Sequence, residues 1–117
     1  METGDLCLFY VPYPEDSSGD GKTRPVAVLA LSDGEHVLLY TVTTKYENKS
    51  ATIKKQYAPI KQWQQAGLDH PSWIDVRGVL RVPRKLLEQR RVVWVGRLTA
   101  EDMTVWADYI RRRGKRA

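Results

Sequence analysis

The chain has 117 residues, 42% of them hydrophobic, which is enough for one compact core and too little for two ordinary domains. The net charge is +5, but residues 1–21 hold five acids and no Lys or Arg, which leaves nine acids against nineteen bases in the remainder. This basic remainder favours a polyanionic partner such as nucleic acid, although surface charge also serves solubility.

Composition also excludes several classes of protein. No apolar run approaches the roughly 20 residues of a membrane-spanning helix, and the acidic start lacks the features of a secretion signal, so we expect a cytoplasmic protein with no membrane partner. One cysteine cannot form an internal disulfide, and no Cys or His spacing resembles a metal site. We therefore expect one domain over residues 1–117, no cofactor and no metal, with Cys7 as a strand residue rather than a nucleophile.

The first half of the chain reads as strands joined by turns. Residues 6–11 predict a strand, and residues 12–22 predict a long flexible loop rich in Pro, Ser, Gly and acidic side chains. Because proline cannot donate to a sheet ladder, Pro25 is expected to be the first residue of the next strand, with Arg24 just outside it. Asp33 and Gly34 predict a turn that leads into a returning strand over 36–42, which makes a hairpin.

The second half mixes short strands with short helices. We expect a polar loop or exposed edge over 45–55, a short strand over 56–60, and a helical turn over 61–66 that ends at Gly67. Residues 73–82 predict two short strands or one bent strand because Gly78 interrupts them. A helical turn over 83–87 and a small strand over 92–95 follow.

The last helix is the clearest local prediction. Thr99 is a good N-cap with Asp102 three residues on, and the apolar stripe consists of Met103, Trp106, Ala107 and Ile110. The basic residues at 111–113 match the negative end of the helix and aid solubility, or contact RNA. Together the elements predict a mainly β (α+β) fold, a small bent antiparallel sheet or barrel with a terminal helix packed on it.

Few residues of the sequence are candidates for catalysis. The spacing of its polar residues predicts no paired catalytic carboxylates, no glycine-rich phosphate loop and no Ser/His/Asp arrangement. A guanidinium held at the mouth of a strand can meet a phosphate with two parallel hydrogen bonds, which makes Arg24 a candidate reactive group. Thr43 ends the strand that pairs with the one following Arg24, so a hydroxyl and a cation can address one phosphate. The plainer interpretation of Thr41, Thr43 and Thr44 is one solvated strand face.

Several motifs in order resemble the MazF/PemK family of toxins. The resemblance runs from about Gly4 to Ile110, and its most specific parts are the Gly-Asp opening followed by Val-Pro and the Arg-Pro before an apolar strand. The matching residues are Gly4-Asp5-Leu6-Cys7-Leu8, Val11-Pro12-Tyr13-Pro14, Arg24-Pro25-Val26, Thr43, Gly67-Leu68, Pro71-Ser72 and Gly96-Arg97-Leu98-Thr99. The sequence departs from the family's pattern over residues 76–81, so its cleavage specificity is expected to differ.

The resemblance implies an SH3-like barrel with short inserted helices and a C-terminal helix, a homodimer, and a sequence-selective endoribonuclease of a bacterial type II toxin–antitoxin pair. The antitoxin would lay an extended acidic segment across the RNA groove. Arg24 and Thr43 match the family's catalytic arginine and the threonine or serine beside it. The candidate RNA-binding residues around them are Lys22, Thr23, Thr44, Lys45, His70 and Ser72.

The sequence leaves alternatives for the two histidines, for the acidic loop and for the function. His70 is a candidate for proton transfer only by its position in a loop, and His36 fits turn solvation better than function. The acidic residues Glu15, Asp16 and Asp20 belong either to a solvated loop or to a cover that mimics RNA over the groove. The rival functions are a small barrel that binds RNA or a protein without cleavage, and a gyrase-inhibiting toxin of the related fold.

Overall fold

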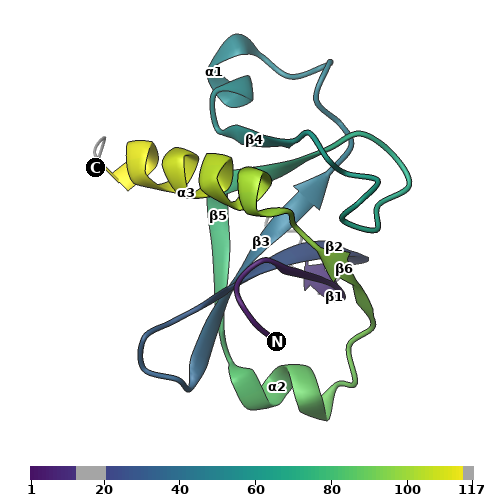
Figure 1. Cartoon of the computed structure of the whole chain (residues 1–117), viewed down its shortest axis with the longest axis vertical. Coiled ribbons are helices and arrows are strands. Elements are labelled where there is room, and N and C mark those ends of the chain that lie inside the picture. The colour runs from purple at the N-terminus through teal and green to yellow at the C-terminus, as the bar shows by residue number, and fades with distance from the viewer. Residues whose placement is uncertain (13–20, 115–117) are drawn as a thin grey trace.

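The protein is a curled antiparallel sheet with three helices on its outside (Figure 1). The computed structural model describes residues 1–12 and 21–114, so Tyr13, Pro14 and the acidic residues 15, 16 and 20 lie outside the described residues. Six strands form one sheet in the order β4-β5-β3-β2-β1-β6. The strands are β1 (Asp5–Pro12), β2 (Gly21–Ala30), β3 (His36–Thr43), β4 (Tyr57–Ile60), β5 (Ser72–Pro83) and β6 (Trp94–Arg97). The helices are α1 (Ala51–Lys54), α2 (Arg84–Gln89) and α3 (Ala100–Gly114).

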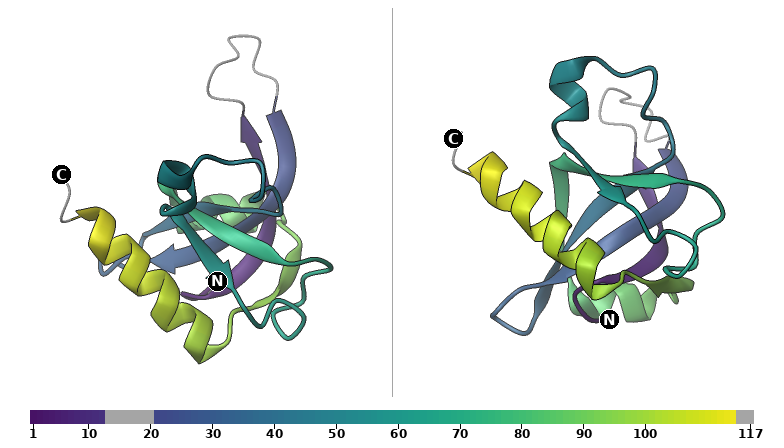
Figure 2. Two further views of the ribbon diagram at one scale, coloured as in Figure 1. Left: turned by 90° about the horizontal axis from the view of Figure 1, so that it is seen from above. Right: turned by 45° about the horizontal axis from the view of Figure 1, so that its top comes forward.

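The six paired strands curl into a half-barrel, which confirms the predicted mainly β class (Figures 1 and 2). The predicted hairpin is present: β2 pairs with β3 from Val26 opposite Thr41 to Ala30 opposite Val37. Its turn forms because Gly34 adopts a φ of 72° and the Asp33 carboxylate accepts the backbone N–H groups of Glu35 and His36. The long strand β5 pairs with β3 on one side and β4 on the other.

Two apolar clusters lie on the two faces of this sheet. One lies under α3, where the ring of Trp106 packs edge-on against that of Tyr40 at a centroid distance of 5.4 Å. The other lies towards α2 and contains Cys7, Phe9, Val28 and Leu87. Cys7 is fully buried in its strand, and burial, together with the Asp5 carboxylate, raises the pKa of its thiol to about 11. This agrees with the expectation of a strand residue.

The predicted start of β2 is wrong. The strand begins at Gly21, so Arg24 and Pro25 lie inside it, opposite Phe9 and Leu8 of β1. Proline is tolerated here because Leu8 directs its own N–H to the carbonyl of Val93, away from β2, and because the ladder with β3 ends at Val26. The missing N–H of Pro25 therefore breaks no ladder hydrogen bond.

Other boundaries differ in smaller ways. The segment predicted as a loop over 45–55 contains α1, whose N-cap Ser50 accepts the N–H of Ile53. Residues 61–66 form turns rather than a helix, and Gly67, with a φ of 94°, ends them as predicted. Of the two alternatives predicted for residues 73–82, the single strand is the one present, because β5 is continuous through Gly78 with a register shift against β3. In α3, Ala107 is exposed rather than part of the buried stripe. No helix among the described residues is long and apolar enough to span a membrane.

Candidate active site

A pocket of about 420 Å³ opens where the ladder between β2 and β3 ends. Antiparallel strands place the start of one beside the end of the other, so Arg24 and Thr43 each lie two residues beyond the last pair, Val26 and Thr41. A third wall comes from the segment that precedes β5. All eight residues predicted for the site line this pocket: Lys22, Thr23, Arg24, Thr43, Thr44, Lys45, His70 and Ser72.

Arg24 is half-buried within β2. Its neighbour across the ladder is the buried ring of Phe9, so the side chain rises from a rigid, apolar part of the sheet. Its Nε is sealed from solvent and has no hydrogen-bond partner among the described residues. Buried polar groups are nearly always paired, and a guanidinium fits the oxygens of a phosphate bidentately. Because the Nε is sealed, an anion in the pocket would be bound by the terminal NH2 groups of the Arg24 guanidinium rather than by Nε.

Thr43 is held by a short local turn. Its Oγ1 accepts the backbone N–H of Lys45 at 3.1 Å, which fixes the oxygen at the end of β3. A hydroxyl has one hydrogen to donate in addition to its acceptor lone pairs. The N–H of Lys45 uses only a lone pair, so the hydroxyl hydrogen of Thr43 remains available to a ligand in the pocket.

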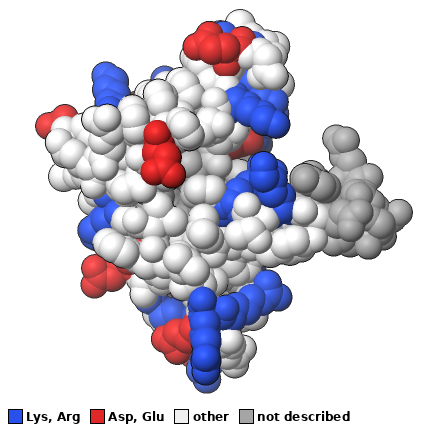
Figure 3. Space-filling model, turned by 90° about the vertical axis from the view of Figure 1, so that its right-hand side faces the viewer, with Lys and Arg blue, Asp and Glu red and all other residues white. Residues whose placement is uncertain are grey.

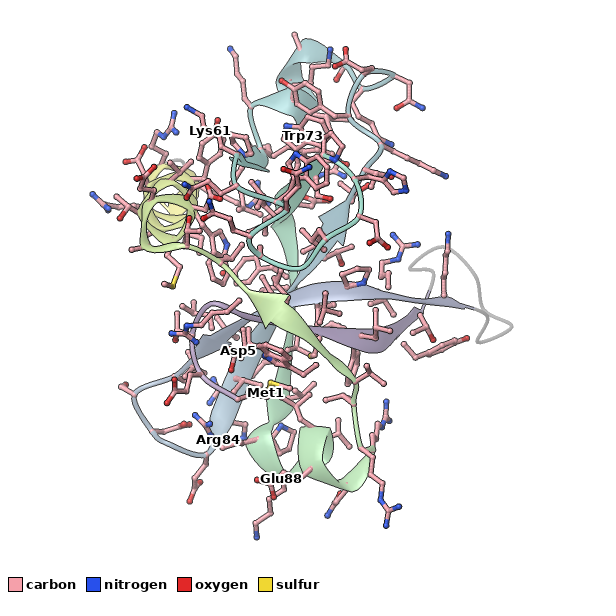
Figure 4. All side chains as sticks on the ribbon, turned by 45° about the vertical axis from the view of Figure 1, so that its right-hand side comes forward. Met1, Asp5, Lys61, Trp73, Arg84 and Glu88 are labelled. Carbon is pink, nitrogen blue, oxygen red and sulfur yellow. The ribbon has the colours of Figure 1, made fainter. Side chains whose placement is uncertain are left out.

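The third wall is fixed by contacts from distant parts of the chain. Gly67 lies so close to the carbonyl of Val95 on β6 that a side chain at this position would collide with it. Asp102, buried at the start of α3, accepts the backbone N–H groups of Lys61 and Gln62 at 3.1 and 2.9 Å (Figure 4 labels Lys61 near α3). These contacts tie the turn before the wall to α3 and the wall itself to β6.

The two predicted residues of this wall differ in what they can offer. Ser72 is buried and its hydroxyl donates to the carbonyl of His70 at 2.8 Å, so Ser72 braces the loop. The imidazole of His70 is exposed at the pocket. Of the two, His70 is the side chain that a bound molecule can reach.

The pocket is predominantly basic. Lys22, Arg24 and Lys45 line it with one acid, Asp69, and none of the three cations forms an ion pair within the described ranges 1–12 and 21–114. Figure 3 shows the right-hand side of the molecule, where basic side chains gather at mid-height and again towards the lower end. Unpaired cations around a positioned arginine are suited to a polyanion.

Sequence reasoning missed the floor of the pocket and one polar residue. The apolar floor is made by Leu8, Pro25, Val42, Leu68 and Val95, which come from five segments that only the fold brings together. Asp69 also lines the pocket, and its position next to His70 was the one available signal. Across the part of the chain that the structure describes, no group of three or more His, Cys, Asp or Glu residues is arranged to hold a metal ion.

Comparison with known proteins places the fold. No family model matches the sequence, and no curated protein matches it. Among solved structures, a MazE–MazF structure from Deinococcus radiodurans aligns with a TM-score of 0.67 at 12% identity, covering 100% of this chain and 97% of that one. The MazF structure from the same organism gives 0.64 at 12% identity over 94% and 92%. The Mycobacterium tuberculosis toxin MazF-mt6 gives 0.61 at 17% identity over 93% and 96%.

These matches cover almost the whole of each chain. The chain therefore shares the fold of these MazF structures, which is the MazF/PemK-like fold that the sequence motifs predicted.

Proposed function

We propose that the protein is a sequence-selective endoribonuclease toxin of a bacterial type II toxin–antitoxin system that cleaves single-stranded RNA without a metal ion. The observation that carries the proposal is that Arg24 and Thr43 line one basic pocket, where Arg24 forms no ion pair with any described residue. The MazF-like fold supports the same assignment. RNA rather than DNA is the substrate because the reaction uses the ribose 2′-hydroxyl as nucleophile.

The proposed reaction is an internal transfer at phosphorus. The 2′-hydroxyl loses its proton and its oxygen bonds to the adjacent phosphorus, while the bond from phosphorus to the 5′-oxygen breaks. The departing 5′-oxygen takes up a proton, so the products end in a 2′,3′-cyclic phosphate and a free 5′-hydroxyl. No external nucleophile or oxidant is required.

The two central residues have separate roles in this reaction. Arg24 stabilises the negative charge that develops on the phosphoryl oxygens, as a fixed cation with parallel N–H donors. Thr43 donates its hydroxyl hydrogen to the phosphate and holds it in line for attack. Arg24 acts electrostatically rather than by proton transfer, because a guanidinium does not lose its proton in a protein.

The remaining pocket residues bind the RNA. Lys22 and Lys45 neutralise phosphates on either side of the cleaved linkage, and Thr23 and Thr44 offer exposed hydroxyls beside them. Ser72 acts by bracing the loop that presents His70. His70 is the candidate for proton transfer because its exposed imidazole lies at the pocket, and an imidazole can both donate and accept a proton.

We further propose a cytoplasmic homodimer that is neutralised by an antitoxin with an extended acidic segment. Structural neighbours of this chain include MazE–MazF structures, which supports an antitoxin partner. An acidic segment complements the unpaired cations of the pocket, so RNA and antitoxin would compete for one surface.

The deciding experiment incubates the purified protein with a long unstructured RNA in EDTA. We expect cleavage at defined sequences, with fragments that carry a 5′-hydroxyl, and the same cleavage when Mg²⁺ replaces EDTA. Intact RNA that is nevertheless bound would identify a non-catalytic binding module. Intact RNA together with altered DNA topology in the presence of gyrase would identify a gyrase inhibitor. Either result would overturn the proposed nuclease.

A further inference from the structure

An aromatic stack stands beside the pocket. The rings of Tyr46 and Trp73 are parallel to within 4°, with centroids 4.5 Å apart, and the ring of Tyr57 lies tilted against Tyr46 at 6.3 Å. The ammonium of Lys54 lies 4.9 Å from the centroid of the Tyr46 ring. Tyr57 is buried, whereas Tyr46 and Trp73 are half-buried. Two of the three rings thus remain accessible in part.

The sheet places this stack directly next to the proposed catalytic hydroxyl. Trp73 is the register partner of Thr43 across β3 and β5. Directly opposed residues on paired strands have Cβ atoms roughly 5 Å apart and point to the same face of the sheet. Ser72, the residue before Trp73, lines the pocket itself. Trp73 (labelled in Figure 4) therefore lies beside Thr43 at the edge of the pocket, although it is not itself one of the residues that line the pocket.

The chemistry of the stack suits an unpaired nucleobase. The indole N–H of Trp73 has no hydrogen-bond partner within the described part of the chain, and it is not sealed from solvent. Proteins that hold single-stranded nucleic acid combine aromatic rings, on which bases stack, with cations that follow the phosphates. Here Lys45 lies on the pocket side of the stack and Lys54 beside Tyr46.

We propose that Trp73 forms a nucleobase subsite: the base next to the cleaved phosphate of a single-stranded RNA stacks on its indole and extends the Tyr46–Trp73 stack. This inference rests on the proposed function for the position of the phosphate. Tyr46 and Lys54 act as positioning residues, because the Tyr46 ring packs against one face of the indole and the Lys54 ammonium packs on the Tyr46 ring. A rigid aromatic surface binds a base with little loss of side-chain entropy.

The test measures binding of a single-stranded oligonucleotide of mixed sequence in which 2′-O-methyl riboses prevent cleavage. Trp73→Ala is expected to weaken binding about tenfold or more, in line with the loss of one stacked base. Trp73→Phe keeps an aromatic face and should stay within about threefold of the original protein. Trp94→Ala is the matched control, because it removes an exposed indole on β6 that does not line the pocket.

Tryptophan fluorescence provides a second measurement that does not depend on the folding of Trp73→Ala. The oligonucleotide should quench the emission of the original protein, and most of this quenching should be lost in Trp73→Phe but not in Trp94→Phe. Unchanged affinity in a folded Trp73→Ala protein, equal losses for Ala and Phe, or quenching that survives in Trp73→Phe would overturn the subsite.

The outcomes also separate this inference from the nuclease proposal. If the original protein cleaves RNA but its affinity is indifferent to Trp73, the subsite fails and the nuclease stands. If RNA is never cleaved but binding depends on Trp73 as described, the stack binds RNA and the nuclease assignment fails.

Discussion

An arginine lies at each end of the β2–β3 ladder, and the two arginines differ in whether the protein supplies a partner for their charge. At the hairpin end, Asp33 accepts two backbone N–H groups and pairs with both His36 at 2.9 Å and Arg81 at 3.5 Å. At the pocket end, Arg24 lines the pocket and forms no ion pair with any described residue. Charges that are matched inside the protein serve its structure, whereas a positioned charge left unmatched is available to a ligand.

The largest expected effect separates the arginines of the two ends. Arg24→Ala should lower the rate of RNA cleavage about 100- to 1,000-fold, which is typical for the loss of one preorganised donor to a developing charge. Arg81→Ala, its matched control, should leave the rate unchanged because Arg81 pairs with Asp33 at the far end of the ladder. Single-turnover cleavage of a defined RNA by both variants provides the measurement. Full activity in a folded Arg24→Ala protein would contradict the assigned role.

The next effect separates two threonines of one strand. Thr43→Val removes the hydroxyl at the pocket and should reduce the cleavage rate about ten- to a hundredfold, the worth of a hydrogen bond to a charged group. Thr41→Val is the control, since Thr41 pairs with Val26 and does not line the pocket. Thr43→Ser should retain most activity. Equal rates for the two valine variants would show that the hydroxyl of Thr43 takes no part.

Asp33 and Asp102 each accept two backbone N–H groups, and their loss should lower the free energy of unfolding by different amounts. Asp102→Ala leaves the N–H groups of Lys61 and Gln62 without their acceptor in a partly buried place, so it should lower the free energy of unfolding by about 1–3 kcal/mol. Asp33→Ala should cost less, because water can replace its carboxylate at the exposed turn. Urea unfolding of both variants measures the difference. An equal loss in the two would show that burial of Asp102 adds nothing.

The smallest effect concerns pH at the hairpin end. The N–H groups of Glu35 and His36, with the His36 side chain, lower the pKa of Asp33 from 3.8 to about 2. A carboxyl whose pKa is lower in the folded state stabilises the fold above its unfolded pKa, and this stabilisation is lost as the pH falls through the folded pKa. The contribution of Asp33 should therefore decline between about pH 4 and pH 2. NMR titration of its carboxyl carbon checks this, and a midpoint near 3.8 would refute it.

The same two aspartates explain what could be predicted from the sequence. The turn at Asp33 and Gly34 is local, since the hydrogen-bond partners of the carboxylate lie within three residues, and the hairpin followed from it. Asp102 was expected only to complete the N-cap of α3. Its N–H does bind the hydroxyl of Thr99, but its carboxylate binds residues 40 and 41 positions away. No local pattern contains such a contact.

The candidate site also contains features that the sequence predicts and features that depend on distant contacts. Strand order and antiparallel pairing were enough to predict that Arg24 and Thr43 belong to one end of a hairpin. The start of β2 was misplaced because Pro25 normally marks a strand boundary, and only the pairing with β1 shows why it is tolerated in the interior. The apolar floor and the stack of Tyr46 on Trp73 depend on contacts between segments distant in sequence, so they became visible only in the fold.

The burial of Cys7 has a practical consequence for all of these comparisons. It is the one cysteine of the chain, it is fully buried, and its raised pKa keeps the thiol protonated at neutral pH. Alkylating reagents react with the thiolate, so labelling requires β1 to leave the core. The rate of labelling thus reports how often the sheet opens, and it can show whether a variant that has lost activity or binding has kept an intact fold.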